Sequence, residues 1–166
     1  MTRASPVLHL FCGKVAAGKS TLARQLASAS GALLLSEDDW LSRLYPDEIH
    51  SLAGYARCSG RLRSALGDHL QALLGAGHSV VLDFPANTVP VRRWMRGLFE
   101  GAGADHKLHL LDAPDALCKA RLRERNRAGC HVFAPGEADY DRITRHFVPP
   151  APDEGFKLLV HPVPSG

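Results

Sequence analysis

The sequence predicts an α/β domain built on a parallel β-sheet with helices on both faces. Short apolar runs of strand length alternate along the chain with longer stretches of helical periodicity, and each run ends near glycine, proline, serine or aspartate. Strands that are apolar throughout are typical of a sheet buried on both faces. The alternation of strand and helix favours parallel strands joined by right-handed crossovers.

Five apolar runs are the expected strands, and six stretches between them are the expected helices. Strands are expected at residues 7–11, 32–36, 79–84, 107–112 and 156–161, and helices at roughly 19–30, 39–45, 48–75, 88–102, 114–127 and 137–147. The third helix has an apolar stripe that should face the core, made by Leu62, Leu66, Leu70 and Leu73. Sheets of this kind bind ligands beyond the carboxyl ends of the strands, so the residues after each run are the functional candidates.

Length and composition fit one globular domain over residues 1–166. The chain is 45% hydrophobic and 22% charged, and no linker or internal repeat divides it. It has no run of 18 apolar residues and no leader-like start, so we expect a cytoplasmic protein without a membrane partner. A net charge of +3 is too small to indicate nucleic acid, which stays an alternative. The sequence does not distinguish a monomer from a homodimer.

The four cysteines show no CxxC spacing, and we expect them to be buried or idle thiols. They are Cys12, Cys58, Cys118 and Cys130. A zinc site formed by Cys118, Cys130 and His131 is the alternative, but no second pair of ligands accompanies them.

The stretch "GKVAAGKS" that follows the first apolar run matches G-x-x-x-x-G-K-[ST], the phosphate-binding loop, or P-loop. Its glycines allow the backbone to turn several N–H groups towards a phosphate chain. Lys19 would reach the β- and γ-phosphates, the Ser20 hydroxyl would ligate Mg²⁺, and Thr21 would donate to the α-phosphate. The predicted nucleotide-binding residues here are Gly13, Lys14, Val15, Ala16, Ala17, Gly18, Lys19, Ser20 and Thr21.

Carboxylates follow two of the expected strands. Asp83 near the end of "VVLDF" is the predicted second Mg²⁺ ligand, the alternative being a turn cap. Asp38 and Asp39 follow the second strand, where a carboxylate could accept the proton of an attacking hydroxyl. One of this pair could instead cap the helix that begins there.

Five segments resemble one family, the small P-loop ATP-binding kinases related to polynucleotide kinase, chloramphenicol phosphotransferase, zeta toxins and gluconate kinases. They are "GKVAAGKST", "LSEDDWLSRLYP", "VVLDFPANTVPVRRWMR", "LDAPDALCKARLRERNRAG" and "HFVPPAPDEGF". The resemblance implies a P-loop NTPase fold of nucleoside-kinase-like type, with strand order 2-3-1-4-5. It also implies ATP and Mg²⁺ as cofactors, and a kinase that phosphorylates an unidentified hydroxyl-bearing small molecule.

The resemblance also assigns roles to residues. Asp38 is the expected general base, with Lys19 and Arg125 as the other catalytic residues. Residues 114–136 are the expected lid, in which Arg121 and Arg125 lie on one helix face and contact the nucleotide. Residues 41–76 are the expected acceptor-binding region.

The acceptor side departs from the polynucleotide kinase pattern. That pattern has an arginine three residues beyond the base, where this chain has Leu41, and the nearest arginine is Arg43. Arg43, Asn87 and Arg92 are the acceptor-binding candidates.

Two other functions compete with a small-molecule kinase. One is a nucleotide switch or ATPase that acts through a protein partner. The chain lacks the N/T-K-x-D base motif of GTPases, and Phe84 follows Asp83 where motor ATPases usually have glutamate. The other is a kinase of zeta-toxin or polynucleotide 5′-hydroxyl type.

Overall fold

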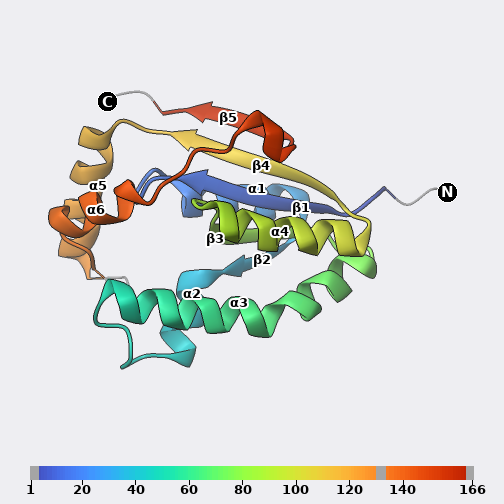
Figure 1. Ribbon diagram of the computed structural model, residues 1–166, viewed down its shortest axis with the longest axis horizontal. Helices are drawn as coiled ribbons and strands as arrows, with labels where there is room; N and C mark the ends of the chain where they lie inside the picture. The colour runs from blue at the N-terminus through green and yellow to red at the C-terminus, as the bar shows by residue number, and fades with distance from the viewer. Residues whose placement is uncertain (1–3, 130–133, 164–166) are drawn as a thin grey trace.

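The computed structural model describes residues 4–129 and 134–163 as an α/β fold around one parallel sheet (Figure 1). The strand order is β2-β3-β1-β4-β5, and every neighbouring pair is parallel. The strands are β1 (Val7–Gly13), β2 (Leu33–Ser36), β3 (Val80–Pro85), β4 (Asp105–Asp112) and β5 (Leu158–Pro162). The predicted fold class and strand order are confirmed.

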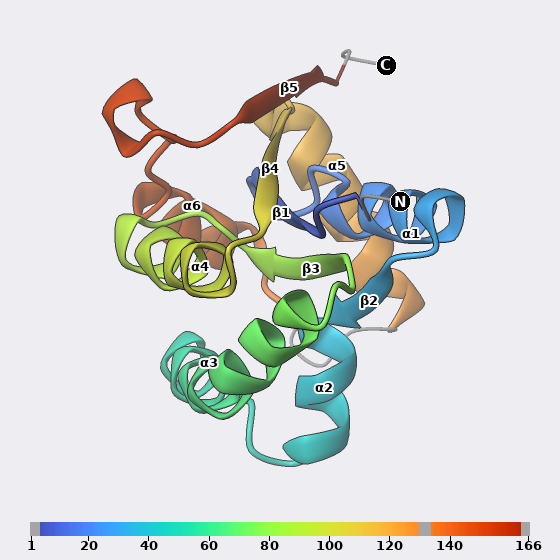
Figure 2. The ribbon, with the colours of Figure 1, turned by 90° about the vertical axis from the view of Figure 1, so that its right-hand side faces the viewer.

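Helices cover both faces of the sheet. Figure 2 shows α1 and α5 on one face and α3 and α4 on the other, with α2 beside the β2 edge. The helices are α1 (Lys19–Ser30), α2 (Glu37–Leu44), α3 (Leu52–Gly75), α4 (Val89–Ala102), α5 (Asp115–Ala128) and α6 (Glu137–Arg145), followed by the short 3₁₀ helix η1 (Pro152–Glu154). Among the described residues, no helix is long and apolar enough to cross a membrane.

Strand β1 explains why both faces need helices. Leu8, Leu10 and Cys12 are buried in the core beneath α3 and α4, whereas Phe11 belongs to the core on the α1 and α5 face. Successive strand residues point to opposite faces, so an apolar strand supplies both cores. The stripe of α3 enters the first core through Leu62, Leu66, Leu70 and Leu74, with Leu73 only partly buried beside it.

Two helix starts differ from the sequence-based expectation. Helix α2 begins at Glu37 because Ser36 is its N-cap, with the Ser36 hydroxyl accepting the N–H of Asp39 at 3.3 Å. The alternative in which Asp38 or Asp39 caps this helix is therefore wrong. Helix α3 begins at Leu52 rather than residue 48, because Ser51 caps it by accepting the N–H of Gly54 at 3.0 Å.

Candidate active site

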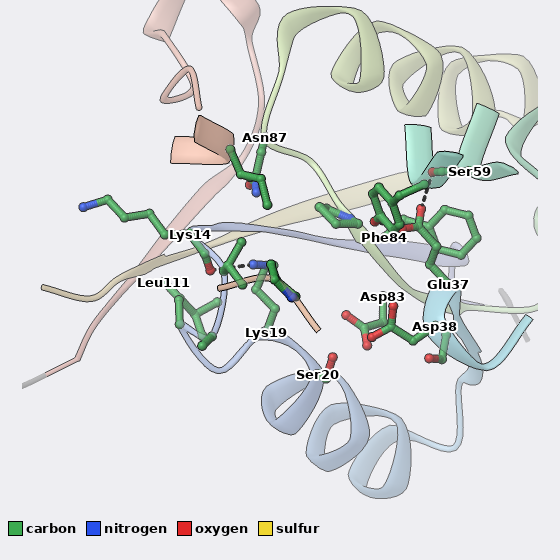
Figure 3. Close-up of a pocket in the computed structure, with 18 of the residues that line it drawn as sticks. Lys14, Lys19, Ser20, Glu37, Asp38, Ser59, Asp83, Phe84, Asn87 and Leu111 are labelled. Carbon is green, nitrogen blue, oxygen red and sulfur yellow. Dashed lines mark hydrogen bonds between the residues drawn. The ribbon is translucent and has the colours of Figure 1, made fainter. Parts of the chain in front are cut away.

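The loop between β1 and α1 folds around its own lysine. Lys19 donates from Nζ to the carbonyl oxygens of Gly13 at 2.5 Å and Lys14 at 2.8 Å (Figure 3). Gly18 (φ 107°) and Ala16 (φ 62°) have left-handed backbone conformations that make this curl possible. The loop leads directly into the N-terminus of α1, where unpaired N–H groups and the helix dipole favour an anion.

Burial inside the loop lowers the pKa of Lys19 to about 8, and the carboxylate of Asp83 opposes this shift. The partners of the Lys19 ammonium group are neutral backbone carbonyls. A negatively charged ligand would therefore stabilise its charge more strongly than they do.

The first glycine of the loop is fixed by a side chain from the β3–α4 connection. Asn87 accepts the N–H of Gly13 at 2.9 Å and donates to its carbonyl at 2.8 Å. A Cβ atom on Gly13 would lie 3.0 Å from the backbone oxygen of Leu111, closer than most Cβ contacts, so a larger residue here would crowd β4. Asn87 lines the cleft, but its amide is engaged in holding the loop, which removes the basis for assigning it to the acceptor.

Asp83 and Asp38 approach each other at the carboxyl ends of β3 and β2. Burial raises the pKa of Asp83, and the facing Ser20 hydroxyl counteracts the rise. The negative charge of Asp38 raises the pKa of Asp83 further, because the two carboxyl groups lie close together. Figure 3 shows both carboxyl groups beside Ser20, at the mouth of the loop. This cluster of oxygen ligands fits Mg²⁺, which prefers carboxylates, hydroxyls and phosphate oxygens.

A buried network next to Asp38 was missed by the sequence-based analysis. Glu37 is 3% exposed, and its carboxyl oxygens accept hydrogen bonds from Tyr55 and from Ser59, the latter at 2.8 Å. Ser59 in turn accepts from Arg63 at 2.8 Å. Burial raises the pKa of Glu37 and the two hydroxyl donors oppose the rise. The signal was present in the sequence, since Tyr55, Ser59 and Arg63 recur every four residues on one helix face.

The two predicted lid arginines both reach the cleft from α5. Arg121 donates to the carbonyl of Ala17 at 3.2 Å. The Nε atom of Arg125 is buried without a hydrogen-bond partner among the described residues. Burial lowers the pKa of Arg125, and the charge of Asp38 opposes that shift, so the two side chains, which both line the cleft, are close enough for their charges to interact.

These groups line one cleft of about 1440 Å³ that runs from the loop to the wall formed by α2 and α3. Its boundary includes parts of both regions expected to contact substrates, from Leu41 to Arg63 and from Arg121 to Pro135. Sequence analysis did not single out three further arginines that line it: Arg24, Arg63 and Arg142.

Two of the acceptor-binding candidates lie outside the cleft. Arg43 is exposed on α2 and is not among the lining residues. Arg92 is completely buried, where it forms an ion pair with Glu154 at 2.8 Å and donates to the carbonyls of Ala86 and Val148. The expectation that Arg92 binds the acceptor is wrong, because its guanidinium is a structural clamp without exposed surface.

The zinc alternative gains no support from the described part of the chain. Cys12, Cys58 and Cys118 are buried free thiols, and Cys130 and His131 lie outside the described residues. In the ranges 4–129 and 134–163, no three histidine, cysteine, aspartate or glutamate side chains gather as a metal site.

Comparison with known proteins identifies the family. Residues 8–150 match the model of a family described as an AAA domain. The chain belongs to this family. No protein with a curated description matches the chain by sequence.

Solved structures similar to the chain are P-loop kinases and a related nucleotide-binding protein. A proposed kinase from Chloroflexus aurantiacus J-10-fl is 24% identical, with a TM-score of 0.75 over 95% of this chain and 85% of that one. The APS kinase CysC of Mycobacterium tuberculosis, in complex with AMPPNP and APS, is 26% identical, with a TM-score of 0.54 over 75% of each chain. Chaetomium thermophilum Kti12 in complex with ADP-AlF3 is 19% identical, with a TM-score of 0.67 over 93% of this chain and 89% of that one. The chain therefore has the fold of the small P-loop kinases.

Proposed function

We propose that this protein is an ATP- and Mg²⁺-dependent kinase that transfers the γ-phosphoryl group of ATP to a hydroxyl of a small molecule. One observation carries the proposal: Asp38 lies beside the Asp83 and Ser20 pair on one side and the Glu37 network on the other. A carboxylate in this position lies between the loop end of the cleft and the part of the cleft lined by α3. The kinase structures among the neighbours agree with such an activity.

In this proposal the loop and the lid bind the triphosphate. Backbone N–H groups of the loop would surround the phosphates, except that of Gly13, which donates to Asn87. Lys19 would exchange its backbone carbonyl partners for phosphate oxygens. Arg121 and Arg125 approach from α5 on the opposite side. Guanidinium groups suit this task because they are planar, permanently charged and bidentate towards phosphate.

Ser20 and Asp83 would hold the Mg²⁺ ion, Ser20 directly and Asp83 directly or through water. When bound, the ion neutralises charge on the β- and γ-phosphates. Burial raises the pKa of Asp83, and the nearby negative charge of Asp38 raises it further. A divalent ion at this point would stabilise the ionised form of both.

Asp38 would accept the proton of the acceptor hydroxyl as its oxygen attacks the γ-phosphorus. Arg125, whose Nε is buried without a partner among the described residues, would contact the transferring group. The base and the positive charge would then act on opposite sides of the same reaction centre.

A second candidate function is a nucleotide switch or ATPase that acts through a partner. Similarity to Kti12 in complex with ADP-AlF3 favours it. A switch needs a site for water next to the γ-phosphate but no space for a second substrate. The cleft of about 1440 Å³ exceeds the usual range of 300–1,000 Å³ for a single ligand site, which supports two substrates and hence the kinase.

Incubation of the protein with Mg²⁺-ATP and a library of hydroxyl compounds tests the proposal. A kinase releases ADP faster with one compound class and forms phosphorylated product in equal amount. ATP hydrolysis at the same rate with and without every compound would favour the switch.

Metal dependence gives a separate check. We expect EDTA to abolish turnover, and Ser20→Ala and Asp83→Asn each to raise the Mg²⁺ concentration needed for half-maximal activity. Asp112→Asn is the matched control, since Asp112 ends β4 outside the cleft lining. Normal turnover in EDTA would contradict the metal assignment.

A further inference from the structure

Helix α3 presents a line of polar side chains to the cleft. Tyr55, Ser59 and Arg63 follow one another at four-residue spacing, and all three line the cleft. Tyr55 and Ser59 are occupied, because both donate to the buried carboxylate of Glu37. Arg63 stands at the end of this line, half-buried.

The guanidinium of Arg63 has N–H donors that form no hydrogen bond within the described residues. Among the described residues, Arg63 donates from one nitrogen, Nη1, to the neutral hydroxyl of Ser59 at 2.8 Å, whereas a guanidinium carries five N–H donors. Among the described residues it forms no ion pair, while Lys14, Arg92 and Arg123 each have a carboxylate partner. A half-buried guanidinium with spare donors gains most from a charged, two-oxygen partner.

The neighbouring carboxylate of Glu37 does not form a two-oxygen contact with the Arg63 guanidinium. Arg63 lowers the pKa of Glu37 against the rise due to burial, so the two charges act on each other. Both Glu37 oxygens, however, already accept hydroxyl donors. The interaction between Arg63 and Glu37 is therefore one through space, with the guanidinium fork unoccupied by a carboxylate of the described residues.

Arg63 lies at the α3 end of the cleft and not at the nucleotide-binding loop. Hydrogen bonds and charge interactions connect Ser20 to Asp83, then Asp38, Glu37, Ser59 and Arg63 in that order. Figure 3 shows the same sequence of positions, with Asp83 and Asp38 between the loop and the pair formed by Glu37 and Ser59. Arg63 thus lies beyond the predicted base, on the side away from Lys19.

We propose that the acceptor of this kinase carries an oxyanion, a carboxylate or a phosphate, and that Arg63 binds it while Asp38 receives the proton of its hydroxyl. This inference rests on the proposed kinase function and names the class of its acceptor. Apolar residues line the cleft nearby, including Leu41, Ala56 and Val91, so the anionic end of the acceptor finds its complement at Arg63.

Binding of matched compound pairs to the protein loaded with Mg²⁺-AMPPNP tests the proposal, with calorimetry as the readout. In the carboxylate arm, gluconate and glycerate are compared with sorbitol and glycerol. In the phosphate arm, glucose 6-phosphate and glycerol 3-phosphate are compared with glucose and glycerol. We expect the anion of one arm to bind about 10- to 100-fold more tightly than its neutral parent, the usual effect of a charged hydrogen bond. Equal or tighter binding of the neutral parents, or no binding of any anion, overturns the proposal.

Three variants tie the effect to Arg63. Arg63→Gln should bind the anion no better than the neutral parent, and Arg63→Lys should retain part of the preference because it keeps the charge. Arg61→Gln is the matched control, since Arg61 is exposed on the same helix and does not line the cleft. If Arg63→Gln lowers the melting temperature but binds the anion as well as the wild type does, Arg63 only balances Glu37 and the proposal is wrong.

The nucleotide reports on the proposed function separately. AMPPNP affinity should be unchanged in Arg63→Gln, because Arg63 lies beyond Asp38. Failure of the wild-type protein to bind Mg²⁺-AMPPNP would overturn the kinase function itself. If the wild-type protein binds Mg²⁺-AMPPNP but shows no preference for the anions, the inference about the acceptor alone is overturned.

Discussion

The two ends of the cleft are built in opposite ways. The nucleotide end consists mainly of one continuous stretch, residues 13–21, in which backbone groups face the ligand site and a left-handed glycine sets the curl. The acceptor end is assembled from α2, α3, the β3–α4 connection and α6. Its polar contacts join residues of different helices, such as Glu37 of α2 with Tyr55 and Ser59 of α3.

This difference separates the effects of substitutions. A loop that binds through its backbone depends on a few glycines and one lysine, so changes there should act on nucleotide affinity. An end built from side chains holds both the reacting carboxylate and the clamps that support it. Changes at the acceptor end should therefore divide into those that reduce the rate and those that reduce stability.

Substitution of the predicted base should have the largest effect on rate. Asp38→Asn keeps the size of the side chain but removes the proton acceptor, so kcat should fall by about 10²–10⁴-fold while ATP affinity stays near that of the wild type. Steady-state kinetics and nucleotide binding measure the two quantities. Asp39→Asn is the control and should change kcat little, because Ser36 and not Asp39 caps α2. If Asp39→Asn abolishes turnover and Asp38→Asn does not, the roles of the two residues must be exchanged.

Removal of the buried clamp should have the largest effect on stability. Arg92→Met leaves Glu154 and two backbone carbonyls without their partner, and breaking a buried ion pair in this way costs about 3–5 kcal/mol. Denaturant unfolding measures the loss. Arg93→Met at the exposed neighbouring position should change the free energy of unfolding by less than about 0.5 kcal/mol. Equal stability of the two variants would contradict a structural role for Arg92.

Substitution of the loop lysine should act on affinity alone. Lys19→Ala removes a charged donor to the phosphates and should weaken ATP binding by about 10- to 100-fold, equivalent to about 1.5–3 kcal/mol. Calorimetry measures the affinity, and a thermal melt checks the fold. Lys107→Ala on the exposed side of β4 is the control. An ATP affinity of Lys19→Ala equal to that of the wild type would contradict the assignment of the phosphate loop.

The smallest predicted effect is a pH dependence of nucleotide binding. The pKa of Lys19 is lowered to about 8 in the empty loop, so Lys19 is charged below pH 8 and loses its proton as the pH rises through that value. Phosphates would raise the pKa again, and binding at pH 8–9 should therefore take up a proton and weaken as the pH rises. Calorimetry in buffers of different ionisation enthalpy measures the uptake. Proton uptake of the same size in Lys19→Ala would assign it to another group.

The sequence predicted the nucleotide end better than the acceptor end. The fold class and the loop that joins β1 to α1 follow from local patterns, because apolar runs and a short motif can be recognised without knowing the tertiary packing. The strand order came from the resemblance to the small P-loop kinases and not from those patterns. Arg92 illustrates the limit. It follows a strand end as a functional arginine would, but its burial depends on Glu154, which is 62 residues away.

The helix starts and the Glu37 network show two further limits. Ser36 as the cap of α2 was overlooked because the acidic residues after it are equally good candidates by residue type. Glu37 was passed over for Asp38 and Asp39, although its partners Tyr55 and Ser59 share one helix face. Sequence spacing identified neither pairing, since it says which residues share a face but not what that face meets.

The bonds of Asn87 have a consequence for when the nucleotide site is completed as the chain folds. Asn87 clamps Gly13 through its side chain, and its own backbone carbonyl accepts the N–H of Val148 at 2.9 Å. Arg92 fastens the same connection to Val148 and Glu154. Asn87 follows Gly13 by 74 residues, whereas Val148 and Glu154, which hold the connection that carries Asn87, are synthesised later still. A nascent chain that ends before residue 148 has the phosphate-binding motif and Asn87 but lacks the contacts that hold Asn87 in place, so nucleotide capture should begin only after the C-terminal segment has docked.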